Sequence, residues 1–188
     1  MCHEIEAKLK VDSHEPIEEK LKAQGALSEG HLMQTDIYFD HENLQLINND
    51  ECLRIRKQAS DSEEKIFLTY KGPKEKGNYK KRREIELRIS DAESAEKLLT
   101  ALGYEKEIFV EKERHRWRLG GCEVLLDNVK QLGTFVEIEG PDAKAIETIQ
   151  NDLQLDNLPH IQESYAHLIT EKLVHQSRNR KKSSNPIR

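Results

Sequence analysis

Charged and apolar residues alternate at the start of the chain, where Glu4, Glu6 and Lys8 are separated by single apolar positions. On a β-strand this alternation sends every second side chain to the same face. The charged pattern returns in most of the later strand-like stretches. Buried charges are tolerated only when they are paired, bound to a metal or in contact with trapped water. The sequence therefore predicts a face that encloses solvent, ions or a charged ligand.

The basic residues of this face have the chemistry to bind phosphoryl groups. Arginine makes planar, two-point contacts with phosphate oxygens, and lysine supplies a compact charge. The basic residues in phase with this face are Arg54, Arg56, Lys71, Arg82, Lys112 and Arg114. We expect these side chains to cradle several phosphoryl groups of one polyanion.

The acidic residues of the same face have the spacing of a divalent-metal site. The two carboxylates of a Glu-x-Glu pair leave one strand face about 7 Å apart, so they can flank one or two divalent ions. A single pair of this kind is common on exposed strands, but here the pairs recur in phase with the cations. The acids that suit Mg²⁺ or Mn²⁺ are Glu4, Glu6, Asp127, Glu137 and Glu139.

Helical and strand-like patterns divide the chain into short elements. Amphipathic stretches predict helices over residues 15–24, 92–102, 143–153 and 161–173. Alternation predicts strands over residues 5–11, 35–39, 53–58, 66–71, 81–89, 110–119, 124–129 and 135–139. Eight strands are therefore expected, with few helices beside them.

Two internal repeats predict how these strands are arranged. Residues 4–9 recur as residues 84–89, each followed by a helix that ends at glycine, and residues 67–73 are echoed by residues 135–141. The repeats indicate an α+β fold of two βαβββ halves with peripheral helices, whose eight mostly antiparallel strands form a closed β-barrel. The charged face would line the interior. The pattern alone also allows the reverse arrangement, with apolar residues filling the barrel.

Composition and length narrow the class of protein. A chain of 188 residues with 36% hydrophobic and 35% charged positions can bury one core. A net charge of −5 argues against a general nucleic-acid coat. No apolar run approaches the roughly 18 to 20 residues of a membrane helix, and the N-terminus starts directly in strand pattern, so a cytoplasmic location is expected. Monomer and homodimer are both compatible with this sequence.

The cysteines and the C-terminal segment add little chemistry. Cys2, Cys52 and Cys122 are odd in number and lack CxxC spacing, so free thiols are expected. Residues 175–188 are rich in basic and small polar residues and are predicted to form a disordered tail. One tunnel domain over residues 1–174 is the expected organisation.

Taken in order along the chain, the charged motifs resemble those of the CYTH superfamily, the triphosphate tunnel metalloenzymes. The motifs are Glu4-x-Glu6-x-Lys8, Leu53-Arg54-Ile55-Arg56, Tyr70-Lys71-Gly72-Pro73, Arg82-x-Glu84-x-Glu86, Lys112-x-Arg114, and Leu126-Asp127 followed by Glu137-x-Glu139. The resemblance covers residues 3–173. Members of the superfamily include class IV adenylyl cyclases, thiamine triphosphatases and inorganic triphosphatases.

The resemblance implies a role for each matching residue. It implies an eight-stranded tunnel in which Glu4, Glu6, Asp127, Glu137 and Glu139 are metal ligands or support them. Triphosphate would be bound by Lys8, Arg54, Arg56, Lys71, Arg82, Lys112 and Arg114. The pair Ser164-Tyr165 on the last helix also resembles a recurring element that closes the tunnel, although an ordinary helix-packing tyrosine fits equally well.

A cationic cage with a metal suffices for phosphoryl or nucleotidyl transfer, because these reactions mainly need positioning and charge neutralisation. The expected activity is hydrolysis of an inorganic or organic triphosphate to diphosphate and phosphate, with Glu6, Glu137 and Lys8 as catalytic residues. Inorganic triphosphate, ATP and thiamine triphosphate are candidate substrates. The alternative is a class IV adenylyl cyclase that converts ATP to cyclic AMP and pyrophosphate. A third hypothesis is a non-catalytic nucleotide or polyphosphate binder, which would not need the acidic set.

Overall fold

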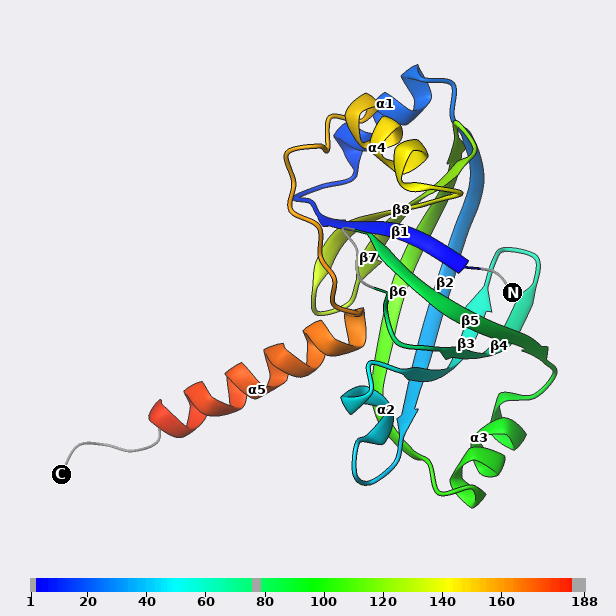
Figure 1. Ribbon diagram of the computed structural model, residues 1–188, viewed down its shortest axis with the longest axis vertical. Coiled ribbons are helices and arrows are strands. Elements are labelled where there is room, and N and C mark those ends of the chain that lie inside the picture. The colour runs from blue at the N-terminus through cyan, green and yellow to red at the C-terminus, as the bar shows by residue number, and fades with distance from the viewer. Residues whose placement is uncertain (1–2, 76–78, 184–188) are drawn as a thin grey trace.

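Eight β-strands form a closed barrel with helices around it (Figure 1). The computed structural model describes the backbone of residues 3–75 and 79–183, and the side chains of residues 5–75 and 79–176. The strands are β1 His3–Lys10, β2 Leu27–Asp40, β3 Cys52–Ala59, β4 Glu64–Lys71, β5 Lys80–Ile89, β6 Glu105–Leu119, β7 Cys122–Val129 and β8 Gly133–Gly140. Their order around the barrel is β1-β5-β4-β3-β2-β6-β7-β8, and β8 pairs with β1. The predicted fold is confirmed.

The two βαβββ halves exchange their first strands. Strand β1 pairs with β8, the last strand of the second half, and β5 pairs with β4, the last strand of the first half. Strands β1 and β5 also pair with each other, as do β2 and β6. All of these pairings are antiparallel. Because the barrel is closed, each of its strands is paired on both sides and no sheet edge is left.

The sequence repeat aligns Glu4 with Glu84, but in the structure the residue of the first half that is equivalent to Glu84 is Glu6, two positions later. Glu139 and Lys71 each stand directly before the Gly-Pro pair of their half. Glu139 pairs with Glu6, whereas Lys71 pairs with Glu84. Glu84 therefore takes the place of Glu6, although the repeat in the sequence matches it with Glu4. Because strand side chains alternate with a period of two, this displacement leaves every side chain on its predicted face.

Five helices surround the barrel: α1 Glu15–Ala23, α2 Gln45–Asn48, α3 Ala92–Ala101, α4 Ala143–Asp152 and α5 Tyr165–Ser183. The side chain of Asp91 accepts hydrogen bonds from two backbone N–H groups at the start of α3, and Asp142 does the same for one at the start of α4. These caps satisfy donors that have no partner within the helix. Within the described part of the chain, no helix is both long enough and apolar enough to cross a membrane.

Two apolar cores lie outside the barrel wall, beneath the helices. Helices α1 and α4 bury Leu21 and Ile146 against the outer faces of the strands around β1 and β8, in a cluster that contains Leu9, Val124 and Ile138. A second cluster lies under α3 and contains Ile37, Ile55 and Leu99. A third cluster lies where α5 meets the barrel and contains Val110, Phe135 and Ile169. Its strand residues point inward, because Val110 pairs with Asp36 and Phe135 pairs with Asp127. The outward faces are thus apolar, and the inward faces carry the charges together with this cluster at the α5 end.

Several element boundaries differ from the prediction. Strands β2 and β6 begin at Leu27 and Glu105, eight and five residues before the predicted starts. Because the two strands are antiparallel, the early part of β2 pairs with the late part of β6, past an irregularity at Gly30, and the early part of β6 pairs with the late part of β2. Tertiary pairing thus extends strands whose local pattern is weak. The four-residue helix α2 was not predicted, and α5 begins at Tyr165 instead of residue 161.

The C-terminal helix also reaches into the segment predicted as a tail. Helix α5 continues to Ser183, while residues 184–188 lie outside the described part of the chain. The domain boundary at residue 174 stays a prediction. Cys52 and Cys122 are free thiols as expected, and Cys2 lies outside the described residues.

Candidate active site

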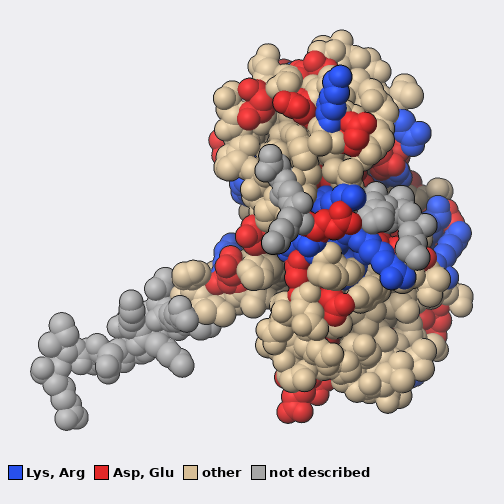
Figure 2. Space-filling model, viewed as in Figure 1, with Lys and Arg blue, Asp and Glu red and all other residues tan. Residues whose placement is uncertain are grey.

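The barrel encloses a cavity of about 700 Å³ with many charged side chains in its walls. The predicted site residues that line it are Glu6, Lys8, Arg54, Arg56, Lys71, Arg82, Lys112, Arg114, Glu137 and Glu139. Figure 2 shows lysine and arginine side chains gathered with acidic ones at the waist of the molecule, between the part that holds α1 and α4 and the part that holds α3. The charged face therefore lines the interior.

A second, polar cavity of about 190 Å³ adjoins the first. Arg56, Arg114 and Glu139 line both spaces. The two cavities therefore lie on either side of these three side chains. Together they give the interior of the barrel the form of a tunnel.

Three carboxylates from two neighbouring strands converge in the larger cavity. One carboxylate oxygen from each of Glu6, Glu137 and Glu139 lies within 4.8 Å of the other two. The strand register explains this grouping, because Glu6 of β1 pairs with Glu139 of β8, and Glu137 lies two residues before Glu139 on the same face. Carboxylate oxygens are hard ligands that Mg²⁺ and Mn²⁺ prefer, and a cation relieves their mutual repulsion. The donor set and spacing therefore fit one divalent ion. The side chain of Glu4 lies outside the described residues.

Lys8 connects this carboxylate group to the start of α5. Its Nζ lies 3.2 Å from Oε1 of Glu137 and donates a hydrogen bond of 3.0 Å to the backbone oxygen of Glu163. It also lies 4.1 Å from the centre of the Tyr165 ring. Burial lowers the pKa of Lys8 to about 8, although Glu137 acts in the opposite direction.

Asp127 holds basic residues in place and lies outside the group of three glutamates. It is fully buried and accepts hydrogen bonds from Lys112 at 2.9 Å and from Nε and Nη2 of Arg114, both at 2.6 Å. The hydroxyl of Tyr165 donates a further bond of 2.9 Å. Burial alone would raise the pKa of Asp127, but Arg114 and Lys112 lower it. With both oxygens occupied by these donors, Asp127 supports the cage.

Tyr165 combines the two roles that the sequence left open. It is buried and packs edge-on against Phe135 at 5.1 Å between ring centres, as a helix-packing tyrosine would. It also lines the cavity, where its ring lies beneath Lys8 and Lys112. The first turn of α5 therefore closes one side of the tunnel.

Asp36 is a buried member of the site that sequence reasoning missed. It is 1% exposed, and its carboxylate accepts bonds of 2.6 and 2.7 Å from Arg56 and one of 3.4 Å from Arg54. Burial alone would raise its pKa, but the two arginines hold it well below the usual range. The signal was available, because Gln34, Asp36 and Tyr38 continue the polar alternation along β2.

Lys80 is a second missed residue, one position before the predicted start of its strand. Its Nζ donates a 2.8 Å hydrogen bond to Oε1 of Glu6. Burial alone would lower the pKa of Lys80, but Glu6 and Glu137 raise it above its ordinary value. Its alternation with Arg82 and Glu84 was the sequence signal.

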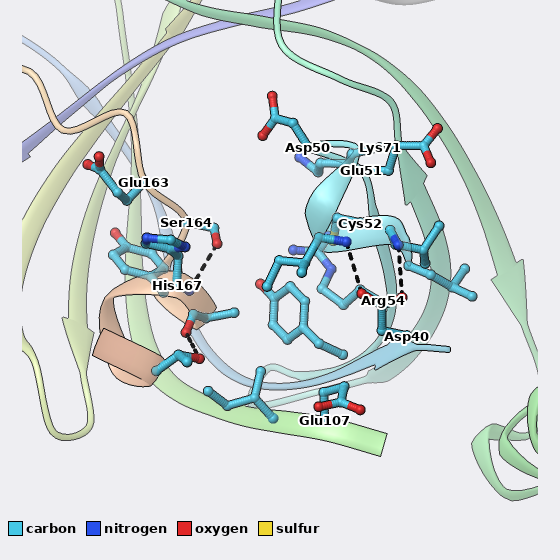
Figure 3. A pocket seen from close by; sticks show the side chains of 18 of the residues that line it. Asp40, Asp50, Glu51, Cys52, Arg54, Lys71, Glu107, Glu163, Ser164 and His167 are labelled. Carbon is cyan, nitrogen blue, oxygen red and sulfur yellow. Dashed lines mark hydrogen bonds between the residues drawn. The ribbon is translucent and has the colours of Figure 1, made fainter. Parts of the chain in front are cut away.

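Lys71 and Arg82, two of the residues predicted to bind triphosphate, pair with acidic residues nearer the outside of the cavity. Nζ of Lys71 lies 2.9 Å from Oε2 of Glu84. Nη2 of Arg82 lies 3.4 Å from Oδ1 of Asp50. Both cations line the cavity, and Figure 3 shows Lys71 with Asp50 and Arg54 across from Glu163, Ser164 and His167.

The buried part of the site carries more positive than negative groups. The carboxylates of Asp36, Asp127 and Glu137 are shared among Arg54, Arg56, Lys112, Arg114 and Lys8. Burial and the neighbouring Arg114 together lower the pKa of Lys112 to about 8, because both disfavour the ammonium form. An anion that enters this cage would relieve the crowding of like charges.

Comparison with known proteins gives relatives over most of the chain. The chain is 35% identical to “Putative adenylate cyclase MJ0240” of Methanocaldococcus jannaschii over 136 residues, which cover 72% of this chain and 75% of that protein. It is 31% identical to the solved structure of PH1819 from Pyrococcus horikoshii OT3, with a TM-score of 0.80 and coverage of 90% and 99%.

A more distant structure shares the fold. “Putative adenylyl cyclase HpAC1” from Hippeastrum, which is described as having a dominant triphosphatase activity, is 16% identical with a TM-score of 0.66, over 90% of this chain and 94% of that one. The model of the CYTH domain family matches residues 2–165. This match covers most of the chain, and the barrel topology and the charged cavity are consistent with it. The chain therefore belongs to the CYTH domain family.

Proposed function

We propose that this protein is a divalent-metal-dependent triphosphatase that hydrolyses a triphosphate to diphosphate and phosphate. The observation that carries the proposal is the direct contact between a metal-competent carboxylate group and a cationic cage. Glu137 belongs to both, because it is one of the three converging glutamates and is also paired with Lys8 and Arg114. A non-catalytic polyanion binder would have no need for the three glutamates.

The residues of the cage position and neutralise the polyanion. Arg54, Arg56 and Arg114 present guanidinium groups that match phosphoryl oxygens, and their carboxylate partners fix them before substrate arrives. Lys8 Nζ is placed beside Glu137 to hydrogen-bond a phosphoryl oxygen or the attacking water. Charge that develops on the phosphoryl oxygens is thereby stabilised without reorganisation of the site.

Mg²⁺ or Mn²⁺ is the proposed cofactor, held by Glu6, Glu137 and Glu139. When bound, such an ion polarises phosphoryl oxygens and activates water. Asp127 supports the cage by holding Lys112 and Arg114.

Adenylyl cyclase activity is the second candidate, and the similarity to MJ0240 favours it because that protein is named as a possible adenylate cyclase. The same cage would then hold ATP so that the ribose 3′-hydroxyl attacks the α-phosphorus. Hydrolysis and cyclisation differ in which phosphorus is attacked, and therefore in their products.

The test is to incubate the purified protein with Mg²⁺ or Mn²⁺ and either tripolyphosphate or ATP, and to identify products by ³¹P NMR. The proposal predicts equal amounts of orthophosphate and pyrophosphate from tripolyphosphate, and no turnover with EDTA. Cyclic AMP with pyrophosphate from ATP would establish the cyclase. Tight binding of both compounds without turnover would show a binding protein.

Variants of the carboxylate group test the metal assignment. We expect Glu6→Gln and Glu137→Gln to abolish metal-dependent turnover, because each removes a charged ligand while keeping the shape of the side chain. Glu111→Gln is the matched control, since Glu111 is exposed and pairs with Lys130 outside the cavity. Full activity of either site variant at ordinary metal concentration would contradict the assignment.

A further inference from the structure

The smaller cavity lies behind the larger one, toward the other end of the barrel. On β3, Arg54 lines the larger cavity, Arg56 lines both and Gln58 lines the smaller one. On the antiparallel strand β2 the order is reversed, with Gln34 at the smaller cavity and Tyr38 at the larger one. Side chains that succeed one another along two strands in this way place the cavities one after the other along the barrel.

Each cavity has its own opening to solvent. The larger one opens beside α2, where Leu44 and Ile47 line it and are exposed. The smaller one opens at Glu86, which is exposed, and at Arg116 and Glu123, whose side chains are 31% and 37% exposed. Its volume of about 190 Å³ is many times the roughly 15 Å³ that one water needs, so it has room for a compact ion.

Arg56 and Arg114 form the boundary between the two cavities, because both side chains line both spaces. Arg56 donates hydrogen bonds through Nε and Nη2 to Asp36, and Arg114 donates through the same two atoms to Asp127. A guanidinium group has five N–H donors. The carboxylates therefore leave donors of both arginines for an anion at the boundary.

The wall of the smaller cavity includes a buried amide pair that stability does not explain. Gln34 is 2% exposed, and its Nε2 donates a 2.6 Å hydrogen bond to Oε1 of Gln58. Its own Oε1 is buried without a hydrogen-bond partner among the described residues. An unpaired buried carbonyl lowers stability. The two amides instead keep this wall polar and neutral, which admits an anion that carboxylates at the same positions would repel.

Hydrolysis at this boundary would leave its two products in a fixed order. Glu139 of the carboxylate group also lines both cavities, so the proposed metal site adjoins the boundary. A triphosphate that enters from the larger cavity reaches Arg56 and Arg114 with its terminal phosphoryl group. After cleavage, diphosphate lies between the orthophosphate and the larger opening. The smaller cavity gives the orthophosphate a second way out.

We propose that the smaller cavity is a product site, which binds orthophosphate and releases it through the second opening while diphosphate still occupies the cage. This inference rests on the proposed function, to which it adds a binding site and a direction of product release. Arg56 and Arg114 share the ion with the cage. Arg116 lies at the opening, and Glu86 and Glu123 beside it favour release over retention, because they repel the anion.

The test is isothermal titration calorimetry of orthophosphate into protein saturated with pyrophosphate, in EDTA so that no metal-dependent turnover occurs. We expect the wild-type protein to bind orthophosphate in this state. Gln58→Trp fills the smaller cavity and should weaken this binding at least about tenfold, with pyrophosphate affinity changed by less than about twofold. Lys57→Trp is the matched control, because Lys57 is the exposed neighbour of Gln58 on the outer face of β3. It should leave both affinities unchanged.

A second variant, Arg116→Ala, tests the same site without added bulk. Loss of this cation at the opening should weaken orthophosphate binding to the pyrophosphate complex by about threefold to tenfold, because one charged contact is removed. Pyrophosphate affinity should change by less than about twofold. Arg118→Ala is the control, since the side chain of Arg118 is 54% exposed and lines neither cavity.

The outcomes separate this inference from the proposed function. A pyrophosphate complex of the wild-type protein that does not bind orthophosphate would overturn the product site, as would undiminished binding in Gln58→Trp and Arg116→Ala. If Gln58→Trp also loses pyrophosphate affinity, the substitution has disturbed the cage and Arg116→Ala decides. Wild-type protein that does not bind pyrophosphate would contradict the cage. A protein that binds both ions but forms no orthophosphate from tripolyphosphate would contradict the proposed function and leave the ion site standing.

Discussion

At the scale of single residues, the buried carboxylates divide into two kinds according to their partners. Asp36 and Asp127 each accept several hydrogen bonds from cations, so their oxygens are already in use. Glu6 and Glu137 also have cationic partners, in Lys80 and Lys8, but together with Glu139 they approach one another, and a divalent ion would relieve the resulting repulsion. The carboxylate group therefore occurs in two settings, which the neighbours of each residue define.

Replacement of Asp36 should destabilise the fold strongly. Asp36→Asn leaves the guanidinium groups of Arg54 and Arg56 buried without their anion, and breaking a buried pair costs about 3 to 5 kcal/mol of unfolding free energy. Urea denaturation followed by circular dichroism at pH 7 measures this loss. Asp156→Asn, at an exposed position, is the control and should change stability by less than about 0.5 kcal/mol.

The wild-type protein and Asp36→Asn can also be compared as a function of pH. Because the pKa of folded Asp36 lies well below its usual range, the carboxylate adds stability that is complete above its unfolded pKa of about 3.9 and is lost as pH falls below that value. The difference in unfolding free energy between wild type and Asp36→Asn should stay constant from pH 7 to 5 and shrink near pH 3.5. A difference that is independent of pH would argue against the ion pairs.

Arg54 should distinguish ligands by the number of their phosphoryl groups. If several phosphoryl groups share the cage, Arg54→Ala will weaken binding of tripolyphosphate more than binding of orthophosphate, because the longer anion has more of its charge in the cage. Calorimetry in EDTA gives both affinities. Arg118→Ala is the control, since Arg118 is 54% exposed at its side chain and pairs with Glu29 outside the cavity. Equal losses for the two anions would contradict a shared cage.

At the scale of elements, the helices seal the apolar outer faces of the strands and thereby allow the inner faces to stay charged. Helix α4 packs against Gly140, the last residue of β8. A Cβ at this position would lie 2.9 Å from Sγ of Cys122 and 3.0 Å from Cγ1 of Ile146 on α4. In the first half the repeated Gly-Pro pair follows β4 directly, and a Cβ at Gly72 would meet nothing closer than 3.7 Å.

This contrast predicts different outcomes for the two repeated glycines. Gly140→Ala should destabilise the protein by about 1 to 3 kcal/mol, the usual cost of overpacking, because it pushes α4 from β8. Gly72→Ala is the matched control and should cost less than about 1 kcal/mol. Thermal unfolding of the two variants tests this. Equal destabilisation would mean that the glycines serve the turn and not the packing of α4.

At the scale of the whole molecule, the barrel has its largest apolar core outside, and its charges inside beside one smaller apolar cluster at the α5 end. Burial of Leu9, Ile138 and Ile146 beneath the helices stabilises the wall, while the interior is held by ion pairs. Such an interior gains little net stability from its charges, since desolvation opposes their attraction. The outer core therefore has to supply the stability that the charged interior does not.

The domain limits can be tested by truncation. Tyr165, Ala166 and Ile169 anchor α5 against the barrel, whereas the described side chains from Glu171 to Gln176 are exposed. We expect a chain that ends at residue 174 to unfold within about 2 °C of the full chain and to hydrolyse tripolyphosphate within about twofold of its rate. A large loss of either would place residues 175–188 within the functional domain.

The sequence by itself determined which face of each strand is charged, because a period of two follows from strand geometry and survives even the two-residue displacement of the repeat. It also determined that the barrel has two similar halves. Local patterns did not reveal the full lengths of β2 and β6, because the early part of each strand is held by its pairing with the late part of the other.

Only the tertiary structure decided which acid does what. Asp127 was predicted as a metal ligand or a support of one, and its oxygens accept bonds from Lys112, Arg114 and Tyr165. Asp36, which was not predicted, holds two arginines. Such roles depend on partners that lie far apart in the chain, as Lys8 and Glu163 do. Alternation fixes the direction of a side chain, but the charge that it meets is set by strands and helices that only the closed barrel brings together.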